Sequence, residues 1–257
     1  MDPLTIISVV GAFIFLFVGV ILEGTNPGQL IGIPAFLIVV LPTIMVGLSG
    51  FVKKDVSTIV AATKRGLFGK VEEADDSVRN LVSFAERARR EGLLALEEEA
   101  KGIEDPFLKK GVQLAVDGTD PEELAEILTL EIQSKKAHDQ IGIKFYNDIG
   151  GYSPTLGIIG AVVGLIAVLQ KLDDPLAAGH GIAVAFIATF YGVAFANMIF
   201  LPLGNKLKRL SEIEVHHMEL MLEGILAIQA GANPRVIEQK LFAFLHQTGD
   251  AEEERAA

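Results

Sequence analysis

Residues 149–170 read IGGYSPTLGIIGAVVGLIAVLQ, and none of them is Asp, Glu, Lys or Arg. A helix rises about 1.5 Å per residue, so roughly 20 residues cross the hydrocarbon core of a bilayer. A helix also satisfies its own backbone hydrogen bonds where water is absent. The stretch therefore predicts a membrane-spanning helix.

Three other runs share this character and also lack charged side chains: Leu4–Leu22, Leu30–Val52 and Gly181–Asn205. Each is long enough to cross a bilayer as a helix. The sequence therefore predicts an all-α membrane protein with four transmembrane helices, helices 1 and 2 in residues 1–52 and helices 3 and 4 in residues 149–205.

Most charged residues lie between the second and third runs, so residues 53–148 are predicted to form a helical, water-facing domain. Within it, apolar residues recur every three or four positions over 77–101, which predicts one amphipathic helix. A second helix should begin at Asp120-Pro121, an N-cap followed by proline, and lead into the third span. Residues 206–257 are predicted to form a C-terminal cytoplasmic helix, broken at 231–234 and followed by a short helix and a disordered polar tail over 249–257.

Orientation follows from the lysines and arginines near the ends of the spans. The two short connectors, 23–29 and 171–180, contain a single basic residue, Lys171, whereas the other flanks are rich in them. The connectors are therefore predicted to lie outside, and both termini and the 53–148 domain in the cytoplasm.

The composition also excludes several classes of function. The net charge of −11 argues against nucleic acid as a partner. The chain has no cysteine, so it has no thiolate metal site or thiol nucleophile. It also lacks a phosphate-binding glycine loop of the P-loop type. We therefore predict a protein that is not an enzyme and has neither a cofactor nor a metal.

The predicted spans contain no ionisable carboxylate or amine, although proteins that move protons keep such a group within the membrane. Either this chain moves no ions, or another chain supplies the carboxylate. The hydroxyl groups of Thr155 and Thr189 are the most interesting polar groups of the later spans, although a bond to the preceding turn's carbonyl is the simplest role for Thr189.

Small residues line one side of each of the later spans: Gly157, Gly160, Ala161 and Gly164 on the third, and Gly192 with its alanine neighbours on the fourth. Such spacing lets helices approach closely in lipid. The pattern fits packing within one chain, and it also fits a ring of subunits or a seam for another protein's helix.

Pro154 and Pro202 lie near the cytoplasmic ends of these two spans. Proline removes a helical hydrogen bond, so each position is either a hinge or a helix terminus near the membrane surface.

The 77–101 segment carries Arg89 and Arg90 followed by Glu97 and Glu98. Such a run is commonly a solvated helix face that contributes little to stability. It also suits the steering and alignment of a partner with complementary charge.

Five motifs in order resemble the MotA/PomA family of flagellar stator subunits, and together they extend over nearly the whole chain. They are RREGLLALE (89–97), SPTLGIIG (153–160), TFYGVAFAN (189–197), LPLGNKL (201–207) and EGILAI with GANPR (223–235).

The resemblance implies a pentameric ring in the bacterial inner membrane. The ring would surround the single helices of a MotB-type partner, whose Asp carries the ion. Ion flow would move the ring, and the cytoplasmic domain would push the rotor protein FliG.

The resemblance also implies roles for single residues. Arg89 and Glu97 match the family's charged rotor-contact pair, and Arg90 and Glu98 adjoin them. Pro154 and Pro202 match the prolines that couple ion passage to cytoplasmic movement. Thr189 matches a pore-facing hydroxyl. Sodium-driven relatives tend to have Thr where this sequence has Ala161, which favours protons over sodium.

Two alternatives stay open at this point. One is an energiser of outer-membrane processes of the ExbB/TolQ type, against which the fourth span and the 89–97 motif argue. The other is a membrane scaffold that conducts no ions and only assembles a complex.

Overall fold

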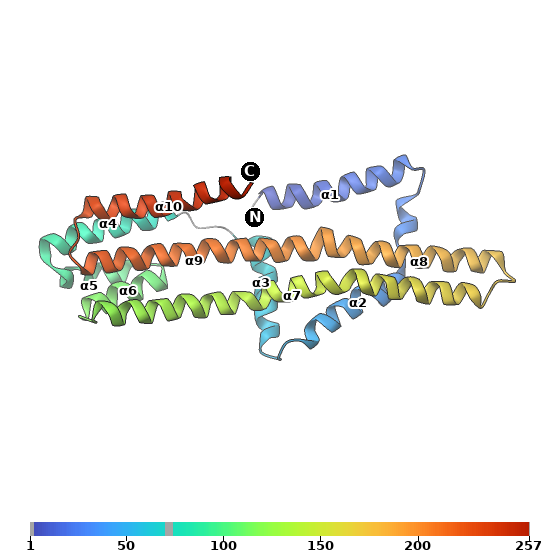
Figure 1. The fold of residues 1–257 in the computed structure, drawn as a ribbon, viewed down its shortest axis with the longest axis horizontal. Helices are drawn as coiled ribbons and strands as arrows, with labels where there is room; N and C mark the ends of the chain where they lie inside the picture. Colours follow the sequence, from blue (N-terminus) through green and yellow to red (C-terminus); the bar gives the residue numbers. More distant parts are fainter. Residues whose placement is uncertain (1–2, 70–73, 257) are drawn as a thin grey trace. The chain divides into compact units, whose positions relative to one another are not determined.

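The computed structural model describes residues 3–69 and 74–256, and all regular structure in these two ranges is helical, as predicted. The chain divides into two compact units, each formed from two stretches of sequence (Figure 1). Unit 1 comprises Met1–Lys70 and His138–Leu210, and unit 2 comprises Val71–Ala137 and Ser211–Ala257. Helices α7 (Pro121–Leu169) and α9 (Leu201–Gln229) contribute residues to both units.

Unit 1 contains the apolar helices. Its other elements are α1 (Pro3–Leu22), the 3-10 turn η1 (Pro27–Leu30), α2 (Ile33–Ser49), α3 (Asp55–Phe68), α8 (Pro175–Phe195) and the π-helical turn η3 (Ala196–Phe200). Two continuous helical stretches are long and apolar enough to cross a membrane, Pro121–Leu169 and Pro175–Gln229. The first and second apolar runs form shorter apolar helices, at Ile7–Leu22 and Ile33–Ser49.

The long helices begin where the sequence supplies caps. Asp120 accepts a hydrogen bond from the Glu122 amide (2.9 Å) at the start of α7, as the Asp-Pro pair predicted. That helix continues without a break into the third apolar run, which confirms the predicted continuity. Asp174 caps α8 in the same way, accepting from the Leu176 amide at 3.0 Å.

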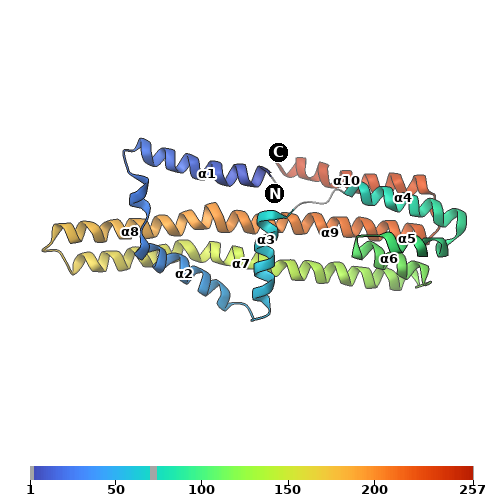
Figure 2. The same ribbon diagram turned by 180° about the vertical axis from the view of Figure 1, so that it is seen from behind.

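Helix α3 runs crosswise to α7 and α9 and packs on both (Figure 2). Glycines make this contact possible, because a Cβ at Gly66 would lie 2.5 Å from Leu203 Cδ1, and one at Gly142 would meet Ala62. Ile59 of α3 lies in the same buried cluster as Ile143 and Leu207. Residues 55–69 and 138–148 therefore pack with the apolar helices, although the sequence grouped them with the 53–148 domain.

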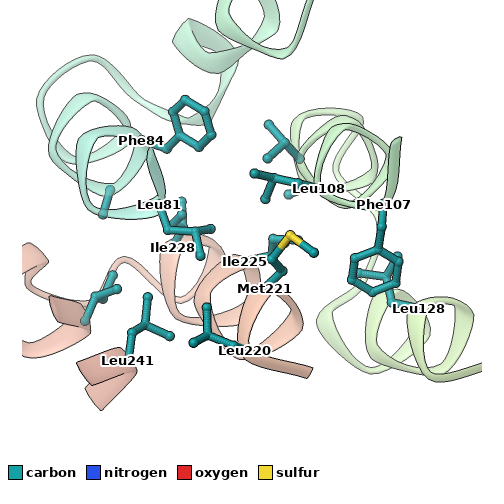
Figure 3. Close-up of a cluster of buried hydrophobic side chains, with 14 of the residues drawn as sticks. Leu81, Phe84, Phe107, Leu108, Leu128, Leu220, Met221, Ile225, Ile228 and Leu241 are labelled. Carbon is teal, nitrogen blue, oxygen red and sulfur yellow. The ribbon is translucent and has the colours of Figure 1, made fainter. Parts of the chain in front are cut away.

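Unit 2 is a helical domain with one apolar core. It contains α4 (Ala74–Glu91), the 3-10 turn η2 (Leu93–Ala95), α5 (Leu96–Gly102), α6 (Pro106–Val116), α10 (Pro234–Ala256) and parts of α7 and α9. Figure 3 shows core side chains from these helices pointing toward one another, among them Leu81, Phe84, Leu108, Leu128, Met221, Ile225 and Leu241. The segment after α9 thus completes the core of the inserted domain.

Two features of unit 2 differ from the sequence prediction. The single helix predicted over 77–101 is wrong, because α4 ends at Glu91 and Gly92 has a φ of 86°. An L-residue rarely adopts a positive φ. Gly231, just after the end of α9, also has a positive φ (70°), and a break was predicted there. Helix α10 extends to Ala256, through the predicted polar tail.

Candidate functional site

The α4–α5 turn gathers the four charged residues that the sequence singled out. Arg89 and Arg90 lie in the last turn of α4, and Glu97 and Glu98 lie in the first turn of α5. All four are exposed. Because the chain turns at Gly92, the basic and acidic residues lie on two different helices rather than along one line of a single helix.

The order of these charges also suits the two helices themselves. Cations stabilise the C-terminal turn of a helix and anions stabilise the N-terminal turn. Glu98 is also paired with Lys101 at 2.7 Å. The hydrogen bond from Lys101 and, to a lesser extent, the positive charge of Lys101 lower the pKa of Glu98. A local structural role and a contact role are therefore compatible at the same residues.

An ion pair joins the two helices on either side of the turn. Arg87 Nη1 of α4 donates to Glu99 Oε1 of α5 at 2.5 Å, and its Nε donates to Glu91 Oε2 at 3.4 Å. The hydrogen bond to Glu99 and the charge of that carboxylate raise the pKa of Arg87. Sequence reasoning missed this pair because it placed both residues in one continuous helix over 77–101.

The second candidate region is the contact between α7 and α8, where glycines replace side chains. A Cβ at Gly192 would lie 2.7 Å from the Ser153 carbonyl oxygen and 2.9 Å from Gly157 Cα. A Cβ at Gly164 would lie 2.9 Å from the Ala185 amide nitrogen, and one at Gly160 would lie 2.7 Å from Ala188 Cβ. The small-residue faces therefore meet each other within one chain.

Ser153 joins the same two helices through a hydrogen bond that the sequence did not single out. Its side chain is buried, and its hydroxyl donates to the Gly192 carbonyl oxygen at 2.9 Å. The carbonyl it reaches belongs to the glycine of closest helix approach. Its position directly before Pro154 was the available signal.

The predicted hydroxyl groups make local bonds. Thr155 is exposed and donates to the Tyr152 carbonyl oxygen (2.7 Å), and Thr189 is half-buried and donates to the Ala185 carbonyl oxygen (3.2 Å). Ala161 is half-buried on α7. Thr155 and Ala161 therefore lie on α7 and Thr189 on α8, and each hydroxyl bonds a carbonyl oxygen of its own helix.

Both prolines lie within continuous helical stretches rather than at helix ends. Pro154 is inside α7, and Pro202 is the second residue of α9, directly after the π-helical turn η3. Pro202 has no amide hydrogen for the Met198 carbonyl, and the preceding Leu201 amide bonds five residues back, to Ala196. The helix thus accommodates the missing donor by widening one turn.

The described residues, 3–69 and 74–256, contain no group of three or more His, Asp or Glu side chains arranged to hold a metal. The chemistry that the two regions support is that of helix contact and charge recognition.

Comparison with known proteins agrees with these motifs. Residues 99–220 match the MotA/TolQ/ExbB proton channel family. Motility protein A of Bacillus subtilis is 38% identical, over 95% of this chain and 91% of the relative. The chain belongs to the MotA branch of this proton channel family.

Solved structures of MotA-branch proteins extend the agreement to the fold. The C. jejuni MotAB structure superposes with a TM-score of 0.91 at 37% identity, covering 95% of this chain and 96% of that one. The flagellar MotAB stator complex of Bacillus subtilis gives 0.86 at 37% identity, covering 93% and 94%. The resemblance predicted from five motifs is confirmed, and the MotA-like match over 95% of the chain argues against the ExbB/TolQ type.

Proposed function

We propose that this chain is the ring-forming subunit of a flagellar stator in the bacterial inner membrane. Four helices span the membrane: the two short apolar helices α1 and α2, and the apolar parts of α7 and α8. The termini and unit 2 face the cytoplasm, in accordance with the basic residues that flank the spans. The observation that carries the proposal is the structural match to MotAB over 95% of the chain.

The ion-carrying group comes from a second chain. The apolar runs contain no ionisable carboxylate, and a proton path needs a group that binds and releases the proton. The solved structures of C. jejuni and Bacillus subtilis relatives described above are MotAB complexes. A MotB-type single-span partner supplies the Asp, and a pentamer of the present chain surrounds its helices.

The contact surfaces available for that assembly lie away from the glycine faces. The close approach of α7 and α8 occupies Gly157, Gly160 and Gly164 within one chain. The opposite side of α7 carries large exposed apolar side chains, including Ile158, Ile159, Val162 and Val163. Neighbouring subunits, partner helices and lipid cover this side in the complex, and protons pass along the ring interior past Thr155, Thr189 and Ala161.

Pro154 and Pro202 couple ion passage to movement of unit 2, because each lies where a long helix leads from the apolar segment into the charged one. A helix that lacks one hydrogen bond bends there at lower cost. Unit 2 then pushes the rotor protein FliG through Arg89, Arg90, Glu97 and Glu98.

Ion flux measured in liposomes tests the proposal. The chain is reconstituted alone, with a MotB-type partner, and with that partner's membrane Asp changed to Asn. We expect proton flux with the intact partner and none in the other two samples. Equal flux from the chain alone would overturn the assignment of the ion carrier, and a complex without flux in any sample would indicate a passive scaffold.

A further inference from the structure

The apolar segment at the α4–α5 turn directs one leucine outward. In the sequence GLLAL (92–96), Leu96 is 1% exposed and lies in the unit 2 core, and Leu93 packs against that core. Leu94, between them, is 72% exposed. Among the described large apolar side chains of unit 2 none is more exposed, since Leu130 follows at 58% and Val236 at 56%.

The backbone of this turn is held firmly. The Gly92 amide donates to the Ala88 carbonyl oxygen (2.8 Å), and the Ala95 amide donates to the Gly92 carbonyl oxygen (3.1 Å). The Arg87–Glu99 ion pair joins α4 to α5 on either side of the turn. Leu94 is therefore presented by a fixed 3-10 turn, and its backbone loses little freedom when a partner binds.

Single exposed leucines are common on protein surfaces, so exposure alone carries no function. Leu94 differs by its surroundings, because the exposed Arg89 and Arg90 precede it and the exposed Glu97 and Glu98 follow it. Protein interfaces commonly place an apolar anchor within a charged rim that steers the encounter.

We propose that Leu94 is the apolar anchor of the rotor contact, an inference that rests on the proposed function. Its partner is a helical surface of FliG with an apolar notch, acidic groups on the side that meets Arg89 and Arg90, and basic groups on the side that meets Glu97 and Glu98. The charges set the rate and orientation of encounter, and burial of Leu94 slows dissociation.

The experiment compares variants of the full-length chain, assembled with its MotB-type partner in nanodiscs and bound to purified FliG at low and high salt. Leu94→Ser should raise the Kd about tenfold through faster dissociation, with an unchanged dependence on salt. Leu94→Met should bind normally because methionine fills the same notch. Leu130→Ser, at an exposed leucine on α7, is the matched control and should change the Kd less than twofold.

The outcomes separate the inference from the function on which it rests. If Leu94→Ser behaves like Leu130→Ser while Arg90→Glu weakens binding and flattens its salt dependence, the anchor is wrong and the rotor contact stands. If the unaltered complex conducts protons but does not bind FliG, the rotor contact itself is wrong, and the anchor falls with it. Torque and membrane protein level in motile cells provide the second readout.

Discussion

The α4–α5 turn and the α7–α8 contact are stabilised in opposite ways. The turn exposes its functional candidates, and its shape depends on one left-handed glycine and one ion pair. The α7–α8 contact has almost no side chain at its centre, and its shape depends on backbone atoms that touch each other. Substitutions at exposed positions of the turn should therefore change function and spare the fold, whereas an added atom at the helix contact should damage the fold first.

The largest effect on stability should come from Gly192→Val. Its Cβ would lie 2.7 Å from the Ser153 carbonyl oxygen, and backbone atoms cannot move aside as a side chain can. Overpacking typically costs about 1–3 kcal/mol, and the rigid surroundings put this site at or above the upper end of that range. We expect loss of membrane-inserted protein and a lower melting temperature in detergent.

Gly179→Ala on the same helix is the control, because a Cβ there would meet no atom within 4 Å. It should leave the protein level and the melting temperature unchanged. If both substitutions lowered the protein level and the melting temperature equally, α8 would be sensitive to any substitution. The special rigidity proposed for the α7–α8 contact would then be wrong.

A smaller effect is expected from Gly92→Ala in the turn. With φ 86° and ψ 165°, Gly92 lies in a backbone region that is essentially restricted to glycine, and an L-residue there costs about 1–3 kcal/mol. Because the α4–α5 geometry would shift, torque should fall even where the ring assembles. Thermal unfolding and torque are measured together, with Gly102→Ala as a control that has no atom near its added Cβ. Normal torque in Gly92→Ala would mean that the turn geometry is not needed for the contact.

The sequence could predict the helical class and the long α7, because charge-free runs and the Asp120-Pro121 cap act locally, and five motifs in order predicted the family. It could not predict the break at Gly92. Apolar spacing continues through that position, and a single glycine inside a helix costs only about 1 kcal/mol. The break depends instead on tertiary contacts, the burial of Leu96 and the Arg87–Glu99 pair.

The site was predictable to a similar extent. Glycine spacing indicated close helix packing, but only the three-dimensional structure shows that α7 and α8 of one chain use those faces. Pro202 indicated a missing donor, but the π-helical turn before it is one of several ways to accommodate that loss. Ser153 stands directly before Pro154, but its hydrogen bond could not be predicted because the acceptor, the Gly192 carbonyl oxygen, lies on another helix.

Ser153→Ala should have a still smaller effect, about 1 kcal/mol, because it removes one buried hydrogen bond between α7 and α8 and leaves their backbone contact intact. Thermal unfolding in detergent measures the loss. Ser49→Ala is the control, since the exposed Ser49 hydroxyl bonds only the Val46 carbonyl oxygen of its own helix. If both variants unfold alike, the Ser153 bond contributes nothing to the helix contact.

The smallest effect on stability and a large effect on torque are expected from charge reversal in the turn. Arg90→Glu and Glu97→Lys alter exposed side chains, so each should cost only the helix-end stabilisation, about 0.3–1 kcal/mol. The melting temperature should therefore fall only slightly, and assembly and proton flux should stay unchanged. Torque should fall because each reversal places like charges against the rotor. A matching reversal on FliG should recover part of the motility, since repulsion becomes attraction again.

Lys109→Glu, on an exposed position of α6, is the control for a change of net charge in the same unit. It should swim normally. The full double-mutant cycle is scored by torque and by membrane protein level. If the single reversals swim as well as Lys109→Glu, the four charges serve only the ends of α4 and α5. The same conclusion follows if the single reversals lose torque only in proportion to the loss of membrane protein, because lower protein abundance alone would then explain the lower torque.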